Sequence, residues 1–104
     1  MDAITGTAAI FGRAFAELAA ERNELEAAVR DLESARIAFT LPEMVKFFAN
    51  PLVPRAAKIE VVDRVFTGCT STILLPFLKV IVIRRRARLI PEILRAALHQ
   101  CLDL

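Results

Sequence analysis

With 104 residues, 56% of them hydrophobic and 25% charged, the chain has room for one small domain and enough apolar side chains for a core, which excludes a disordered protein. Uncharged apolar runs such as 73–78 are far shorter than the roughly 18 residues that a membrane-spanning helix needs. The start Met1-Asp2 lacks the positive charge of a secretion signal, so we expect no export. The net charge of +2 conceals an asymmetry, because residues 1–43 carry four basic and eight acidic side chains and residues 44–104 carry ten and four. Such a chain either packs acidic helices beside basic ones or orients against a charged partner.

The N-terminal third has apolar residues at helical spacing. They predict a first helix over residues 4–22, in which Ile4, Phe11, Phe15 and Leu18 recur at helical spacing. Ile10, Phe11 and Ala14 lie beside the main stripe, so this helix also has a surplus apolar face. Asn23 followed by Glu26 resembles a capping box and predicts a second helix that runs to about Ala38.

Two shorter helices are predicted in the middle of the chain. Thr40 with Glu43 repeats the capping pattern, and Pro42 suits the first turn of a helix that ends near Ala49. The prolines within 50–54 must break the helix, after which Pro54 can begin a fourth helix. The apolar face of this helix consists of Ile59, Val62 and Phe66, and Gly68 is placed to end it.

The apolar run 73–83 has strand propensity at Val80–Ile83, but no second strand candidate exists to pair with it. We therefore predict a fifth helix over 72–86, with Pro76 in or near its first turn, and a sixth helix from about Leu89 to Leu102 with Pro91 at its start. The predicted fold class is all-α, a six-helix bundle forming a single domain over 1–104.

The residues give no support for an active site. His99 is the only histidine, so neither a metal cluster nor a histidine-activated nucleophile is expected. No glycine-rich phosphate loop exists, and the carboxylates are scattered at positions predicted to face solvent. Cys69 and Cys101 are predicted to be reduced thiols. We expect no enzyme activity, no catalytic residue, no metal and no cofactor.

One dense cluster of positive charge consists of Arg84, Arg85, Arg86 and Arg88. It can complement the dipole at the end of the fifth helix, or it can contact the phosphates of a nucleic acid. No aromatic residue lies among these arginines, and no recognition helix accompanies them, which favours the structural interpretation.

The predicted fifth helix is apolar on both faces. Leu74, Leu78 and Ile81 share one face, whereas Pro76, Val80 and Ile83 lie nearly opposite. A helix that is apolar all round must be surrounded. It is either central in its own bundle, or it lines a groove that receives an amphipathic helix from another chain.

Three motifs in order resemble those of the ATP synthase delta subunit family, which includes the mitochondrial oligomycin-sensitivity-conferring protein. The run 50–55 with Lys58 resembles its N-P-L-[IV]-P-x-x-x-K signature. The segment 77–93 resembles its F-L-x-[IL]-[IL]-V run, arginine-centred turn and L-[LI]-P-E-I, and 11–19 resembles its opening Y-A-x-A-L-F-x-L-A, with glycine at position 12 for alanine. The spacing is most similar to the bacterial and plastid branch.

The resemblance implies a six-helix N-terminal domain that holds the catalytic head of an F-type ATP synthase still and catalyses nothing itself. In that family the first and fifth helices bind N-terminal helices of the alpha subunits. The positions that match the family's contact faces, and that we expect to bind the partner here, are Thr7, Phe11, Ala14, Pro76, Lys79, Val80 and Ile83. Pro76 replaces a usual asparagine and Ile83 a usual polar residue, so this groove is expected to be more apolar than is typical.

Family members continue for another segment that joins the peripheral stalk. We expect the chain to be the isolated N-terminal domain or a fragment of a longer protein. The stalk b subunit would be contacted only through the absent C-terminal part, so this chain is expected to bind the head but not the stalk, and no nucleic acid. Membrane association would be indirect, on the cytoplasmic face of a bacterial inner membrane rather than in a plastid or mitochondrion. The alternatives are a basic helical module that binds nucleic acid through Arg84–Arg88 and a bundle that associates with its own copies through its apolar faces.

Overall fold

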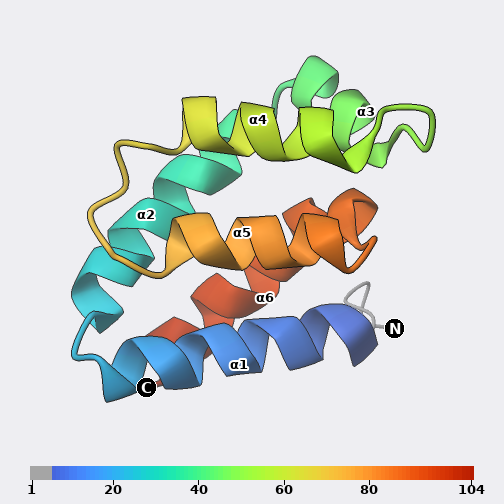
Figure 1. The fold of residues 1–104 in the computed structure, drawn as a ribbon. Coiled ribbons are helices and arrows are strands. Elements are labelled where there is room, and N and C mark those ends of the chain that lie inside the picture. The colour runs from blue at the N-terminus through green and yellow to red at the C-terminus, as the bar shows by residue number, and fades with distance from the viewer. Residues whose placement is uncertain (1–5) are drawn as a thin grey trace.

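The computed structural model describes residues 6–104, and these fold into six α-helices and one short 3-10 turn (Figure 1). Within the described residues, therefore, the predicted all-α six-helix class is confirmed; Ile4 of the first predicted helix lies outside them. In chain order the elements are α1 (Gly6–Glu21), α2 (Leu25–Ala38), α3 (Pro42–Ala49), α4 (Arg55–Val65), α5 (Leu74–Ile83), the 3-10 turn η1 (Ala87–Leu89) and α6 (Ile90–Asp103).

The helices form two layers. Figure 1 shows α1, α5 and α4 side by side in one layer, with neighbours running in opposite directions, while α2 and α6 cross behind them. α1 packs chiefly on α6 in the layer behind, whereas α5 packs chiefly on α4 in its own layer. The core between the layers contains Phe15, Leu32, Leu78 and Leu94, all essentially inaccessible to solvent.

α1 and α6 approach each other closely at Gly12. A Cβ atom built at this position would lie 2.8 Å from the backbone carbon and the Cβ of Ala96 and from the backbone nitrogen of Ala97. The absence of a side chain at Gly12 therefore sets how closely α1 can approach α6.

The first predicted capping box is wrong, because Asn23 ends α1 instead of beginning α2. Asn23 has a left-handed backbone with φ of 56°. The N–H of Glu24 donates to the carbonyl of Ala19 (2.8 Å) and that of Asn23 to the carbonyl of Ala20 (3.1 Å). This is the Schellman pattern, in which asparagine can replace the usual glycine.

The other predicted end signals also need correction. The Thr40 hydroxyl donates to the carbonyl of Ile37 (2.7 Å) and does not cap α3, although Pro42 is the first residue of that helix, as predicted. Gly68 has no left-handed backbone and lies beyond Phe66, the residue that follows α4.

α5 is shorter than the predicted 72–86. It begins at Leu74, which places Pro76 in the first turn as expected. It ends with a second Schellman pattern, in which the N–H of Arg86 donates to the carbonyl of Ile81 (2.9 Å) and that of Arg85 to the carbonyl of Val82 (3.0 Å). Arg85 has the left-handed φ of 61°.

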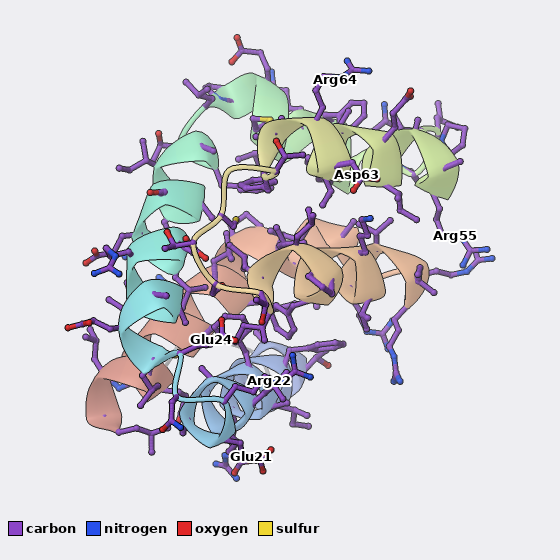
Figure 2. All side chains as sticks on the ribbon, turned by 60° about the vertical axis from the view of Figure 1, so that its left-hand side comes forward. Glu21, Arg22, Glu24, Arg55, Asp63 and Arg64 are labelled. Carbon is purple, nitrogen blue, oxygen red and sulfur yellow. The ribbon has the colours of Figure 1, made fainter. Side chains whose placement is uncertain are left out.

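Asp31 of α2 and Glu24, the residue before α2, hold the connection between α4 and α5 with their carboxylates, contrary to the prediction that the acidic side chains all face solvent. Asp31, only 5% exposed, accepts hydrogen bonds from the N–H of Thr70 (2.8 Å) and from the N–H and hydroxyl of Ser71 (2.7 and 2.6 Å). Glu24 accepts from the N–H and hydroxyl of Thr72 (2.7 and 2.6 Å), and Figure 2 shows it beside this connection. The two residues therefore fix the position at which α5 starts.

A candidate docking groove between α1 and α5

α5 has one face in the core and one face in solvent. Leu74, Leu78 and Ile81 are fully buried, whereas Val80 is 41% exposed and Ile83 52% exposed. The predicted division of the helix into two apolar faces is confirmed. The second face is not covered by any of the described residues, so burial within its own bundle does not account for it.

A groove of about 530 Å³ runs between this exposed face and α1. Its floor and walls are mainly apolar, with two arginines; the lining residues are Ile10, Phe11, Ala14, Leu18, Arg22, Thr72, Ile73, Pro76, Phe77, Val80 and Arg84. Phe77 spans the gap between the helices, because its ring lies 4.8 Å from the Phe15 ring and 6.3 Å from the Phe11 ring, centroid to centroid. Such aromatic contacts hold the groove open at a defined width.

Four of the seven predicted partner-binding residues line this groove together: Phe11, Ala14, Pro76 and Val80. Thr7 lines an adjoining hollow of about 470 Å³ with Ile10, Phe11, Arg84 and Arg86.

The remaining two predicted residues lie outside both hollows. The Lys79 ammonium group is 2.6 Å from the Asp63 carboxylate of α4, and Figure 2 shows Asp63 on the side of α4 that faces α5. Lys79 thus joins α4 to α5. Ile83 is exposed, and its backbone carbonyl accepts a hydrogen bond from Arg55 Nη1 (2.9 Å).

The groove also contains residues outside the seven predicted ones. Ile10, which the sequence places beside the main stripe of the first helix, is 71% exposed on α1. Arg22 and Arg84 directly follow α1 and α5, which run in opposite directions, so only the tertiary structure shows that both belong to one groove.

Potential catalytic groups in the described chain are separate from one another. His99 is exposed and its Nε2 lies 3.7 Å from the carboxylate of Asp103, one turn further along α6. Cys69 and Cys101 are free thiols, and burial raises the pKa of each, Asp31 adding to the effect at Cys69. Residues 6–104 contain no group of three or more histidine, cysteine or acidic side chains that could hold a metal ion.

Residues 6–104 also contain no helix that is long and apolar enough to cross a membrane.

The arginines that follow α5 line different hollows instead of one stripe. Arg84 lines the groove and, with Arg86, the hollow beside it, whereas Arg85 and Arg88 line a separate hollow near α3 and α4. A backbone of regularly spaced phosphates needs a continuous track of cations, which this division does not provide.

These features define an all-α domain with an apolar groove between two antiparallel helices. Comparison with known proteins identifies the class more closely. Residues 8–103 match the family model described as ATP synthase delta (OSCP) subunit. The chain belongs to this family.

Two relatives illustrate the range of the family. The chain is 35% identical over 84 residues to the chloroplastic ATP synthase delta chain of Sorghum bicolor, and 32% identical over 77 residues to the ATP synthase subunit delta of Syntrophomonas wolfei. These matches cover 80% and 73% of the chain, but only 34% and 42% of the two relatives. The chain thus spans less than half the length of either relative.

Proposed function

We propose that this chain is the part of an ATP synthase delta subunit that grips the catalytic head, by binding an N-terminal helix of an alpha subunit in the groove between α1 and α5. The observation that carries the proposal is the uncovered apolar face of α5, with Val80 at 41% exposure beside Phe11 and Ala14. The family membership supports it, because the relatives are named as ATP synthase delta subunits.

The shape and chemistry of the groove suit an amphipathic helix. An apolar floor between two parallel ridges accepts residues spaced at i, i+3, i+4 and i+7 along one face of such a helix. Phe11, Phe77 and Val80 supply the contact area, and a few anchors of this kind provide most of the affinity, each worth on the order of 1–3 kcal/mol when truncated.

The charges around the groove indicate the sign of the charge that a partner helix would carry at its margins. Arg22 and Arg84 line it, and none of the described residues that line it is acidic. A docking helix with acidic side chains at its margins would complement these guanidinium groups, which affects the rate of association and the register more than the strength of binding.

The role is mechanical and non-catalytic. A subunit that holds the head against rotation must bind tightly and keep its shape under load. Two packed layers, with the connection before α5 hydrogen-bonded to Asp31, suit that need. The chain would associate with the membrane through the assembled complex, on the cytoplasmic face of a bacterial membrane. The stalk b subunit would be contacted by the part of a delta subunit that lies beyond this chain.

The test is calorimetric titration of the chain with a synthetic peptide of the first 20–25 residues of an alpha subunit from a related synthase. We expect saturable binding at one site. Val80→Asp is expected to weaken it by on the order of tenfold to a hundredfold, because a desolvated carboxylate would face the apolar side of the peptide.

The matched control is Ile37→Asp, which adds the same charge at an exposed isoleucine of α2 outside the groove. Binding by this variant should equal that of the unmodified chain, and both variants should keep the helical circular dichroism spectrum. An unfolded Val80→Asp variant, or equal loss of binding in the control, would contradict the location of the site.

A further inference from the structure

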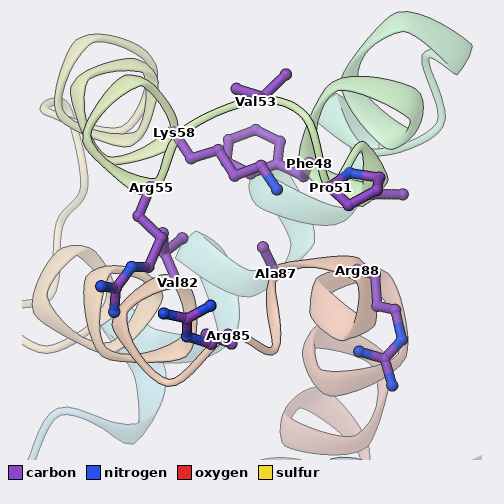
Figure 3. A pocket seen from close by; sticks show the side chains of 10 residues that line it. Phe48, Pro51, Val53, Arg55, Lys58, Val82, Arg85, Ala87 and Arg88 are labelled. Carbon is purple, nitrogen blue, oxygen red and sulfur yellow. The ribbon is translucent and has the colours of Figure 1, made fainter.

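The basic hollow is a second site with unusual chemistry, separate from the groove. Its volume is about 210 Å³, and α3, α4, α5 and the turn before α6 enclose it (Figure 3). Its described lining contains four cationic side chains and no acidic one; the lining residues are Phe48, Ala49, Pro51, Val53, Arg55, Lys58, Val82, Arg85, Ala87 and Arg88.

The central feature is Lys58, the lysine of the proline-rich motif. This residue is only 8% exposed, and within residues 6–104 no hydrogen bond or ion pair reaches its ammonium group. Figure 3 shows that its side chain extends over the hollow, past Phe48. The ammonium nitrogen itself is not among the buried side-chain atoms that lack a partner, so it faces solvent in the hollow. An anion that enters the hollow would replace water beside this nitrogen and gain a charge-assisted hydrogen bond.

Three exposed arginines line the rim of the same hollow. Figure 3 shows Arg55 and Arg85 on one side of the hollow and Arg88 on the other. Arg55 is fixed by the hydrogen bond from its Nη1 to the carbonyl of Ile83 (2.9 Å). Arg85 occupies a left-handed backbone position that favours glycine, which is a strained placement for a long cationic side chain. Strain of this kind is commonly found at functional sites.

We propose that this hollow binds a phosphate group, either as inorganic phosphate or as a small phosphate ester, with Lys58 as the central ligand and Arg55, Arg85 and Arg88 around it. Guanidinium groups match the oxygens of phosphate in pairs, and a phosphate carries about 1.5 to 2 negative charges at neutral pH. A carboxylate, with one charge and two oxygens, would leave most of the four cations unbalanced. The volume suits one phosphate with a small substituent, because drug-sized ligands need roughly 300–1,000 Å³.

The proposal is independent of the groove, because no residue lines both sites. If the alpha-subunit peptide did not bind, the phosphate proposal would still stand. If phosphate did not bind, the proposal for the groove would still stand.

The experiment is calorimetric titration of the chain with inorganic phosphate and with glycerol 3-phosphate, at an ionic strength held constant with sodium chloride. We expect one saturable site. Lys58→Met keeps most of the apolar stem and removes the charge, and it should lower the affinity at least tenfold. Tighter binding of glycerol 3-phosphate than of inorganic phosphate would indicate that the apolar wall of the hollow contacts the organic part of a phosphate ester. Equal affinity for the two would indicate a site for free phosphate.

Two further variants keep the test decisive. Arg64→Met removes one positive charge from the outer side of the same helix, where Figure 2 shows Arg64 pointing away from α5, and it should bind phosphate like the unmodified chain. Arg85→Gly relieves the left-handed backbone strain, so it should fold even if Lys58→Met does not, and it should also bind several-fold more weakly. The absence of a saturable site, or undiminished binding by folded Lys58→Met or by Arg85→Gly, would overturn the proposal.

Discussion

At the scale of single residues, Gly12 determines how closely the two most extensively packed helices approach. An added Cβ would lie 2.8 Å from backbone atoms of α6, which cannot move aside as a flexible side chain could. Gly12→Ala is therefore expected to lower the free energy of unfolding by about 1–3 kcal/mol, even though alanine is the better helix former. Urea titration followed by circular dichroism measures the change.

The matched substitution is Gly68→Ala. No atom lies within 4 Å of a Cβ at Gly68, and its φ is not in the left-handed region. Alanine should raise the free energy of unfolding here by about 0.4–1 kcal/mol, because it restricts the unfolded chain. Destabilisation of similar size at both positions would show that helix spacing is not the cause.

Predictions from the sequence are least accurate for single residues at the ends of helices. Asn23 and Thr40 each precede an acidic residue by three positions, which is the capping-box spacing. The same asparagine also suits the left-handed end of the preceding helix, and the spacing cannot distinguish the two uses. The hydrogen bonds of Glu24 to Thr72 span 48 residues, so no local pattern could have indicated them.

At the scale of elements, the position of α5 depends on Asp31 of α2. Burial alone would raise the pKa of Asp31, but the hydrogen bonds from Ser71 and Thr70 outweigh burial and hold the pKa below its usual 3.8. A carboxyl group whose pKa is lower in the folded state stabilises the fold above the unfolded pKa, and this stabilisation is lost as the pH falls through the folded pKa.

Asp31→Asn should lower the free energy of unfolding at pH 7 by about 1.5–3 kcal/mol, because an amide offers only one acceptor to three donors. The difference in unfolding free energy between this variant and the unmodified chain should shrink as the pH falls from the usual 3.8 down through the lower pKa of folded Asp31, where that carboxylate becomes protonated. Urea titrations at a series of pH values measure this. Glu33→Gln removes an exposed carboxylate from the same helix and is the control; a pH-independent difference for Asp31→Asn would contradict the role of ionisation.

Elements were more predictable than their ends. The order and number of helices followed from apolar spacing and from the prolines, since Pro42, Pro76 and Pro91 all lie in first turns. The exposed face of α5 could be predicted because its apolar residues exceed what one buried face can hold.

At the scale of the whole molecule, the sites depend on which helices meet. Lys79 matches the contact face of the family in sequence, yet here it pairs with Asp63, because α4 packs beside α5. The basic hollow joins residues from 48 to 88, and only the tertiary fold brings Lys58 close to Arg85. The sequence places the four cationic residues of the basic hollow on separate elements, so it cannot show that they line one hollow.

The two sites share α5 and the turn that follows it as a common wall, with Arg84 on the groove side and Arg85 on the hollow side. A ligand that binds only the folded state at a hundred times its dissociation constant adds about 2.7 kcal/mol to the free energy of unfolding. For a domain of this size that corresponds to a rise of roughly 10–20 °C in the melting temperature. Because the described backbone of the wall is held at both ends, by Asp31 and by the Schellman pattern at Arg85, we expect it not to move when either site fills.

The alpha-subunit peptide and phosphate should therefore stabilise the chain additively, each by the same amount in the presence or absence of the other. Urea titrations with each ligand alone and with both together measure the two contributions. A combined stabilisation that differs from the sum by more than about 0.5 kcal/mol would show that the wall transmits binding from one face to the other, and thermodynamic reciprocity would then require each ligand to change the affinity of the other by the same factor.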